Sequence, residues 1–370
     1  MPGPLEGVRV LALAGLGPGP FASMLLADLG ADVVRVDRPP HRLARALGQT
    51  AEFTARQDVV NRGTRSIALD LKSSEGVSRV LELAAEADVF MEGFRPGVTE
   101  RLGLGPEALL QANARIVYSR LTGFGQDSEF AATAGHDINY LAESGALHSM
   151  GGEGLRPKPP LNLLGDYAGG GLLAAFGIVS AVLRARTTGE GQVVDAGMVD
   201  GVALLTAKLQ GLRAAGLLSD LPGTNFIDSG APFYDTYKCS DGRYLAVGAL
   251  ESDFYRQFLS GLGVDTDGWP DQNDESSWPE LRRRISEAVK ERTMREWAGI
   301  FDSLDACVSP VLTFDEAAQR HHKRGLYAEL DGALQPAPAP RFSRTPARPP
   351  ATPDENLLDV GELLASWRRS

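Results

Sequence analysis

Residues 8–37 read VRVLALAGLGPGPFASMLLADLGADVVRVD, and this stretch decides the fold. Its apolar start, Val8–Ala14, predicts a strand that is buried on both faces. Apolar residues at helical spacing predict a helix over Phe21–Gly30, and Asp32–Asp37 predicts a second strand. A strand, a helix and a strand in this order form a βαβ unit, which pairs its two strands in parallel.

Strands and helices alternate in the same way further along the chain. Strands are expected at Ser66–Leu71, Asp88–Met91, Arg115–Arg120 and Gly191–Met198, and helices at Ser73–Glu86, Pro106–Asn113, Asp166–Arg186 and Val199–Ala215. Apolar strands that alternate with helices predict a doubly wound α/β domain, in which a mostly parallel sheet carries helices on both faces. We assign residues 1–224 to this large domain.

The pattern changes after residue 224. The stretch Pro232–Ala249 predicts an antiparallel hairpin with its turn at Ser240-Asp241-Gly242. Helices are expected at Asp253–Leu262, Pro279–Lys290 and Met294–Leu304. We assign residues 225–330 to a smaller α+β domain.

A proline-rich segment follows this second domain. From Ala333 the chain reads ALQPAPAPRFSRTPARPPATP, and proline at that density excludes regular structure and favours an extended arm. A short apolar helix is expected at Asn356–Ser366, beyond the arm. We therefore expect residues 331–370 to return and dock on the large domain.

The composition excludes several classes of protein. The 370 residues have a formal net charge of -11 and a pI near 5.1, so the surface repels nucleic acid and anionic membranes at long range. No apolar run reaches the roughly 18 residues of a membrane span, and no secretory leader precedes the first strand. With only two cysteines, Cys239 and Cys307, far apart in the chain, the sequence offers no disulfide framework and no cluster with metal-ligand spacing. We expect a cytoplasmic protein with no nucleic-acid or membrane partner.

The loop after the first strand, Gly15–Pro20, has some features of a dinucleotide-binding loop. That fingerprint requires glycine at its first, third and sixth positions, and here Pro20 occupies the sixth. Pro18 and Pro20 also remove two of the N–H groups that would bind a pyrophosphate. The sequence therefore disfavours NAD or FAD as a cofactor.

Seven stretches together resemble the alpha-methylacyl-CoA racemases, which belong to the class III CoA-transferase superfamily of the CaiB/BaiF type. They are GPGPFASMLLADLGADVVRVDRP (17–39), LDLK (69–72), EGFRPGVTERLGLGPE (92–107), AGHDINYL (134–141), PLNLLGDYAGGG (160–171), GEGQVVDA (189–196) and PAPRFSRT (338–345). The resemblance covers essentially the whole chain. It implies a doubly wound large domain, a smaller domain and an interlocked homodimer. It also implies an acyl-CoA substrate and no metal, flavin or nicotinamide, with coenzyme A entering only as part of that substrate.

Moving the proton on the carbon next to a thioester carbonyl requires a base on one face, an acid on the other, and donors for the enolate oxygen. An imidazole exchanges protons near neutrality, which makes His136 the first candidate. The resemblance assigns the two acid–base roles to His136 and Asp166, and to Glu251 a hydrogen bond that orients the histidine. Backbone N–H groups at the start of a helix are free and could bind the enolate oxygen. The residues beside His136 are expected to face the substrate: Gly135, Asp137, Ile138, Asn139 and Tyr140.

Each of these residues also has an ordinary structural interpretation. From spacing alone, His136 is consistent with a surface or capping residue. Asp166 is consistent with the N-cap of a helix, and Glu251 with the start of the helix that follows it.

Coenzyme A carries phosphates, so an acidic chain needs a local cluster of positive charge to bind it. Arg38 and Arg95 each follow a predicted strand at the edge where open α/β sheets bind ligands, and Arg101 is close behind. By resemblance these three arginines face the phosphates, while the backbone of Asp70, Leu71 and Lys72 and of Gly93 and Phe94 holds the nucleotide. Taken singly, each arginine is also consistent with an exposed, solvated charge.

Three functions are compatible with these residues. The first is epimerisation of 2-methyl-branched acyl-CoA thioesters by proton transfer through an enolate. The second is CoA transfer, with Asp166 as a covalent nucleophile that forms an aspartyl thioester. The third is acyl-CoA binding without catalysis. A role for His136 favours the first, because transfer through a carboxylate has no evident need for an imidazole there.

Overall fold

The computed structural model describes residues 3–39, 56–152, 154–349, 351–354 and 356–369. The chain divides into two compact units. The large unit comprises Met1–Ser144, Pro160–Leu205 and His321–Ser370, and the small unit comprises Gly145–Pro159 and Thr206–Arg320. The small unit thus begins before residue 225 and takes in a segment from the middle of the predicted large domain, while residues 321–330 belong to the large unit.

A six-stranded parallel sheet forms the centre of the large unit. Its strands are β1 (Arg9–Leu13), β2 (Asp32–Asp37), β3 (Arg65–Ala68), β4 (Val89–Glu92), β5 (Val117–Thr122) and β6 (Gln192–Gly197), in the order β3-β2-β1-β4-β5-β6. The predicted parallel α/β sheet is confirmed. The strand order reverses between β1 and β4, and ligands of such sheets bind outside the carboxyl ends of the strands at that point.

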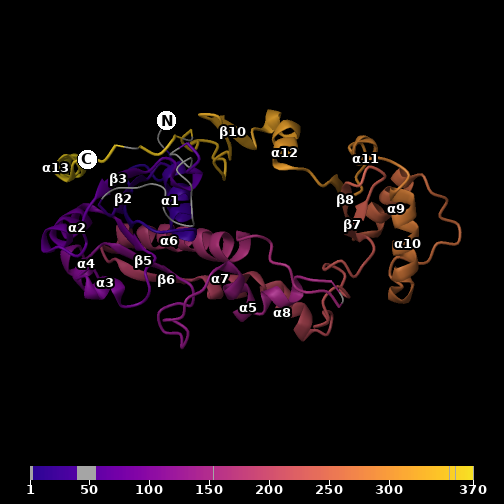
Figure 1. The fold of residues 1–370 in the computed structure, drawn as a ribbon, viewed down its shortest axis with the longest axis horizontal. Helices are drawn as coiled ribbons and strands as arrows, with labels where there is room; N and C mark the ends of the chain where they lie inside the picture. Colours follow the sequence, from indigo (N-terminus) through magenta and orange to yellow (C-terminus); the bar gives the residue numbers. More distant parts are fainter. Residues whose placement is uncertain (1–2, 40–55, 153, 350, 355, 370) are drawn as a thin grey trace. The chain divides into compact units, whose positions relative to one another are not determined.

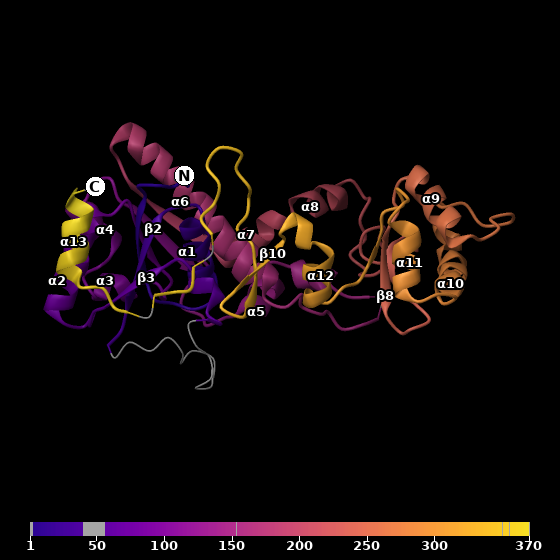
Figure 2. The ribbon, with the colours of Figure 1, turned by 90° about the horizontal axis from the view of Figure 1, so that it is seen from above.

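Helices cover both faces of this sheet (Figures 1 and 2). One face packs against α1 (Pro18–Asp28) and α6 (Leu173–Thr188), and the other against α2 (Ser74–Glu86), α4 (Pro106–Ala112) and α13 (Val360–Arg369). Successive side chains of a strand point to opposite faces. In β1, Val10 and Ala12 accordingly join the first core, whereas Leu11 and Leu13 join the second.

The predicted helix over 166–186 begins earlier and is longer. A π-helical stretch, η3 (Leu163–Leu172), runs directly into α6. By length and composition alone, the continuous helix Leu163–Thr188 could cross a membrane, so the expectation that no stretch is long and apolar enough is wrong. Half of its most apolar window is buried, as in the core helix of a globular protein. The helix predicted over 199–215 is divided at Thr206 into α7 (Met198–Leu205) and α8 (Ala207–Ala214).

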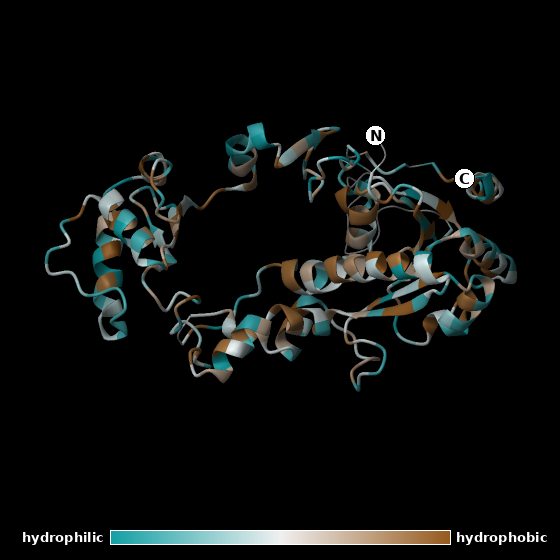
Figure 3. Cartoon of the chain, turned by 180° about the vertical axis from the view of Figure 1, so that it is seen from behind, coloured by the Kyte–Doolittle hydropathy of each residue, from teal (hydrophilic) through white to brown (hydrophobic). Residues whose placement is uncertain are grey.

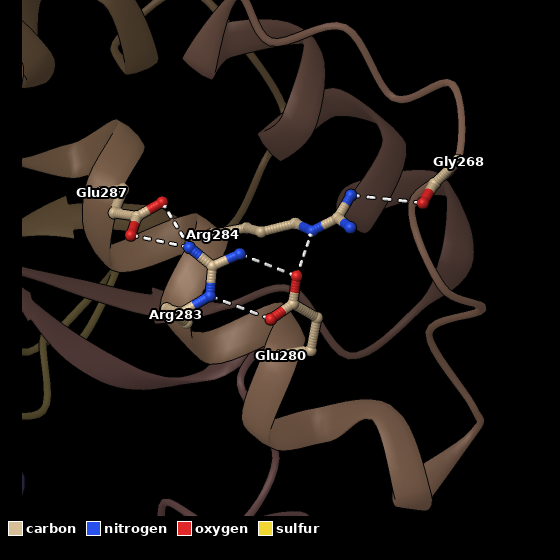
Figure 4. A network of polar contacts seen from close by, with 5 residues as sticks. All are labelled: Gly268, Glu280, Arg283, Arg284 and Glu287. Carbon is tan, nitrogen blue, oxygen red and sulfur yellow. Dashed lines mark hydrogen bonds and ion pairs between the residues drawn. The ribbon is translucent and has the colours of Figure 1, made fainter.

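The small unit is built on a three-stranded antiparallel sheet. Its elements are β7 (Tyr234–Lys238), β8 (Tyr244–Gly248), β9 (Val308–Pro310), α9 (Ser252–Leu262), α10 (Trp278–Val289) and α11 (Met294–Phe301). The aromatic side chains of Phe258 and Trp297 are buried in its core. Figure 4 shows the outer face of α10, where Glu280 accepts hydrogen bonds from Arg283 and Arg284. The predicted hairpin and the helices of this unit are present.

Shorter elements complete the two units. They are α3 (Val98–Arg101), α5 (Asp137–Glu143), α12 (Phe314–Arg320), β10 (Tyr327–Leu330), β11 (Ala333–Pro336) and the 3-10 turns η1 (Val59–Asn61), η2 (Ala146–Ser149), η4 (Glu275–Ser277) and η5 (His322–Arg324).

The C-terminal segment packs along the large unit. The expectation that proline excludes regular structure after Ala333 is wrong, because β11 pairs with β10 and ends at Pro336, where a strand tolerates proline. Further on, the Arg348 N–H donates to the carbonyl of Asp28 at 2.8 Å. The indole of Trp367 on α13 donates to the Asp32 carboxylate at 2.7 Å.

Candidate active site

The carboxyl ends of β1 and β4 mark the edge of the sheet where open α/β folds bind ligands. The first loop of this edge follows β1 and contains Gly17, whose backbone is left-handed with a φ of 63°. Glycine adopts this conformation at little cost, whereas other residues rarely do. Pro18 then begins α1, as proline commonly does in the first turn of a helix. The loop therefore starts a helix, as the failed dinucleotide fingerprint indicates.

His136 lies immediately before α5 and is exposed. Its backbone is extended, and its N–H donates to Oδ1 of Asn139 at 3.0 Å, which caps the helix. On its other side, the hydroxyl of Tyr140 donates to the carbonyl of Gly135 at 2.6 Å. The capping interpretation of His136 is thus correct for its backbone, and the residue is exposed.

Asp166 lies in the first turn of η3 rather than at its N-cap, which is Asn162. The carboxylate of Asp166 accepts a hydrogen bond from Nδ2 of Asn162 at 3.2 Å. Burial raises the pKa of Asp166, the Asn162 hydrogen bond lowers it, the charge on Asp137 raises it, and the imidazole of His136 lowers it. His136 and Asp166 belong to the same compact unit, where the side chain of Asp137, the residue after His136, contacts the backbone of Asp166.

The side chain of Asp137 joins these two segments. It is buried, and its Oδ2 accepts hydrogen bonds from the backbone N–H groups of Gly165 at 2.6 Å and Asp166 at 2.8 Å. Sequence reasoning placed Asp137 next to the substrate and did not predict this bridge. A pair of residues that lie 29 positions apart in the chain gives no local signal of such a contact.

Glu251 belongs to the small unit, where it is the residue that precedes α9. Its backbone carbonyl accepts from the Tyr255 N–H at 2.9 Å, as expected at a helix start. Within the part of the chain that the structure describes, its carboxylate has no hydrogen bond. The proposed contact of Glu251 with His136 stays a prediction.

Four cations lie at the same edge of the sheet. Arg38 follows β2, Lys72 follows β3, Arg95 follows β4, and Arg101 ends α3; all four are exposed. None of them forms an ion pair within the described ranges. Because the carboxyl ends of parallel strands share one edge, this arrangement concentrates positive charge on an otherwise acidic chain.

The predicted nucleotide-binding segments are short turns beside these cations. The Lys72 N–H donates to Oδ1 of Asp70 at 3.0 Å, and Leu71 lies between them, partly buried. After β4, Gly93 is exposed, and the Phe94 N–H donates to Oε2 of Glu92 at 2.7 Å.

A buried polar cluster below the second turn was missed from the sequence. Glu92 ends β4 and lies 3.9 Å from Arg120 in β5, and Arg120 also pairs with Glu100 on α3. Burial raises the pKa of Glu92 to about 7, although the Phe94 N–H and Arg120 act against it. The sequence did contain one signal for this cluster, because the charged residue Glu92 directly follows the apolar run Val89-Phe90-Met91. Among the described residues, no group of three His, Cys, Asp or Glu side chains could hold a metal ion.

A sequence model of CoA-transferase family III matches residues 5–355. The chain belongs to CoA-transferase family III. It is therefore an enzyme of this family, as the seven motifs predict. Two curated relatives in the family are the alpha-methylacyl-CoA racemases of Mus musculus and Homo sapiens. The mouse protein is 48% identical over 356 residues, which cover 95% of this chain and 90% of the relative. The human protein is 46% identical and covers 93% and 88%.

CoA-transferases of family III are also similar to this chain. Human succinyl-CoA:glutarate CoA-transferase is 30% identical over 94% of the chain and 83% of its own length. Among solved structures, a CAIB/BAIF family protein from Brucella suis matches 99% of this chain and all of its own, with a TM-score of 0.83 and 25% identity. Because relatives of both kinds match this chain, family membership does not distinguish racemase from transferase activity, and the residues of the site must do so.

Proposed function

We propose that this enzyme epimerises the alpha carbon of 2-methyl-branched acyl-CoA thioesters. The observation that carries the proposal is the hydrogen-bonded bridge from Asp137, which directly follows His136, to the backbone of Asp166, whose carboxylate lies against Gly17 in the loop after β1. The similarity to alpha-methylacyl-CoA racemases at 46% and 48% identity supports the same activity.

The proposed reaction has two proton transfers on one carbon. One of the pair removes the alpha proton, and the electrons of the broken C–H bond form a planar enolate. The other residue then donates its proton to the opposite face of that carbon. His136 and Asp166 exchange the acid and base roles according to which epimer binds. The enolate oxygen is assigned to the backbone N–H groups of Asp137 and Ile138, the first two residues of α5.

The environment of Asp166 suits a residue that must both take and give a proton. An ordinary aspartate is almost fully ionised at neutral pH and is therefore a poor proton donor. Burial raises the pKa of Asp166, and the negative charge of Asp137 adds to this effect. A larger fraction of Asp166 is then protonated near neutrality, which is the form needed for donation.

The coenzyme A part of the substrate is assigned to the exposed cations. Arg38, Arg95 and Arg101 are proposed to bind its phosphates, with the turns at 70–72 and 93–94 against the nucleotide. Arginine suits phosphate because its planar guanidinium offers paired donors.

The test follows the alpha carbon of a 2-methylacyl-CoA in heavy water. His136→Ala and Asp166→Ala are each expected to lower epimerisation by about 100-fold or more. Each variant still has one base, so it should exchange the alpha proton of one epimer for deuterium without inverting the carbon. The two variants should do so with opposite epimers, because the bases that remain lie on opposite faces. His148→Ala, an exposed histidine of the small unit, is the matched control. Undiminished epimerisation in either active-site variant removes that residue from the mechanism.

Transferase activity is the alternative, because family III relatives with that activity also match this chain. In that reaction the carboxylate of Asp166 attacks the thioester carbonyl, which forms a mixed anhydride and releases CoA thiolate; the thiolate then attacks the aspartyl carbonyl, so that the donor acid leaves and an aspartyl–CoA thioester forms. Hydroxylamine, added with acyl-CoA and an acceptor acid, would convert Asp166 to a hydroxamate that mass spectrometry detects. We expect no such adduct, and its appearance would replace the epimerase proposal with the transferase.

We also propose that the enzyme is a homodimer. Leu172, Phe176, Val179 and Leu183 are exposed at spacings of four, three and four residues, which places them on one face of the long helix. Phe176 and Leu183 are 70% and 68% exposed, whereas the opposite face of α6 lies in the core of the large unit. Figure 3 shows apolar residues along this helix.

A second copy of the chain is the proposed occupant of this face. Phe176→Asp is expected to convert a dimer to a monomer in light scattering, while Arg184→Ala on the same helix leaves the dimer intact. A monomeric wild type, or binding of the wild type to lipid vesicles, would contradict the proposal.

A further inference from the structure

The carboxylate of Asp137 occupies a buried position between the two segments that carry the proposed acid and base. Asp137 is the first residue of α5 and directly follows His136. Its side chain reaches the N–H groups of Gly165 and Asp166 in the first turn of η3, at 2.6 Å and 2.8 Å. Hydrogen bonds to an ionised acceptor are stronger than those between neutral groups. One carboxylate oxygen thus fixes the backbone of Asp166 relative to the backbone beside His136.

We propose that Asp137 is a positioning residue, whose carboxylate sets the separation and orientation of His136 and Asp166 across the reacting carbon. This inference rests on the proposed epimerase function. It assigns no direct contact of the Asp137 side chain with the reacting carbon, because that side chain is 4% exposed and faces the backbone of η3.

Close packing leaves little freedom at this bridge. A Cβ atom on Gly165 would lie 2.8 Å from Oδ2 of Asp137, so only glycine lets the carboxylate approach the backbone. On the other side of His136, the hydroxyl of Tyr140 holds the carbonyl of Gly135. A Cβ atom on Gly135 would lie 2.8 Å from the Tyr140 ring, so that contact is equally close. The residues on both sides of His136 are therefore anchored.

The second oxygen of the carboxylate supports a role beyond stability. Oδ1 of Asp137 is buried and has no hydrogen-bond partner within the residues described by the structure. An unpaired buried acceptor costs about 1–3 kcal/mol. A neutral side chain would avoid much of that cost. The negative charge is instead held next to Asp166, where it acts on the acid–base pair.

The charge of Asp137 and the bridge make separate contributions that an experiment can distinguish. Three groups act on the pKa of Asp166: Asn162 from its own segment, and Asp137 and His136 from the start of α5. The charge of Asp166 in turn raises the pKa of Tyr140 on α5. Removing the negative charge of Asp137 lowers the pKa of Asp166. Asp166 then gains its proton only at lower pH, so the low-pH limb of the rate profile moves to lower pH.

Two substitutions test the proposal in the full-length enzyme. Asp137→Asn keeps an amide oxygen for the two N–H donors and removes the charge, so we expect the low-pH limb to move down with a small loss of kcat. Asp137→Ala removes the bridge, and a loss of alignment predicts a fall of about 100-fold in kcat. In both variants KM for the acyl-CoA stays within about twofold, because the cations that bind coenzyme A are untouched.

The control is Glu143→Gln, which removes an exposed carboxylate from the same helix without changing the bridge. If Asp137 only stabilises the fold, its variants melt at lower temperature while kcat of the folded enzyme and the low-pH limb are unchanged, and that result overturns the inference. Failure of the epimerase proposal is seen separately, as undiminished epimerisation by His136→Ala or Asp166→Ala. If those two variants lose activity and Asp137→Asn leaves the limb in place, only the positioning role fails.

Discussion

The carboxylate of Asp166 lies against the backbone of Gly17. A Cβ atom on Gly17 would be 3.3 Å from Oδ2 of Asp166, which is tighter than an ordinary van der Waals contact. Gly17 follows β1, at the point where the strand order reverses, and Asp166 is in the first turn of η3. The glycine loop that resembles a dinucleotide site thus provides space for an acid instead of a pyrophosphate.

Gly17→Ala is expected to impair catalysis more than folding. A residue other than glycine at its φ of 63° and ψ of -109° costs about 1–3 kcal/mol, and the added methyl also presses on the Asp166 carboxylate. Gly7→Ala is the matched control, because Gly7 has a φ of 77° and a Cβ atom there would meet nothing within 4 Å. Thermal unfolding should show similar losses in both variants, while kcat falls about tenfold or more only in Gly17→Ala. Equal activities would contradict the contact.

Asn162→Ala is expected to move the low-pH limb of the rate profile to higher pH. Nδ2 of Asn162 donates to Asp166 at 3.2 Å, and this hydrogen bond lowers the pKa of the carboxyl. Without the donor the pKa of Asp166 rises, so the residue loses its proton only at higher pH. The direction is opposite to that expected for Asp137→Asn. Profiles of kcat/KM for the two variants, measured side by side, check the pair, and movement in the same direction would contradict both assignments.

The sheet and the position of the site could be predicted from the sequence because their signals are local. Apolar strands and amphipathic helices repeat in order, and the carboxyl ends of parallel strands share an edge wherever the strands pair. Arg38 and Arg95 could therefore be placed at that edge from the sequence alone. The resemblance to alpha-methylacyl-CoA racemases, and not the spacing of residues, led to the proposed acid–base roles of His136 and Asp166.

The contacts inside the site could not be predicted in this way. The bridge from Asp137 to Gly165 joins residues 28 positions apart, and the position of Asp166 over Gly17 depends on the packing of η3 against α1. The strand β11 was missed for the same reason. It ends at Pro336 in a proline-rich segment, and its partner β10 lies earlier in the chain. These features depend on tertiary packing, which no pattern within one segment records.

Arg62→Met is expected to destabilise the large unit by about 3–5 kcal/mol, because it leaves a buried carboxylate unpaired. Arg62 pairs with Asp28 at 2.6 Å, with side chains 2% and 5% exposed, and it also donates to the carbonyl of Pro336 on β11 at 2.6 Å. Arg79→Ala, from an exposed pair on α2, should cost less than about 1 kcal/mol. Urea unfolding measures both changes. Adding Asp28→Leu to Arg62→Met should recover most of the loss, and no recovery would show that the unpaired charge is not its cause.

Glu92→Gln is expected to stabilise the enzyme at pH 8 and to leave its stability unchanged near pH 4.5. Burial raises the pKa of Glu92 from 4.5 to about 7 in the folded state. A group whose folded pKa is raised contributes its full stability below the unfolded pKa and loses it as the pH rises through the folded pKa. The loss for this carboxyl amounts to about 3 kcal/mol by pH 8. The glutamine keeps an oxygen that can accept the Phe94 N–H, so the turn at 93–94 is retained.

The measurement is the free energy of unfolding in urea at both pH values. Glu75→Gln, which removes an exposed carboxylate at the start of α2, serves as the control and should change stability little at either pH. A gain for Glu92→Gln that is the same at both pH values would mean that the ionisation of Glu92 does not cause it. A gain seen only at pH 8 would show that the ionisation of Glu92, which accepts a hydrogen bond from the turn before Arg95, lowers the stability of the fold.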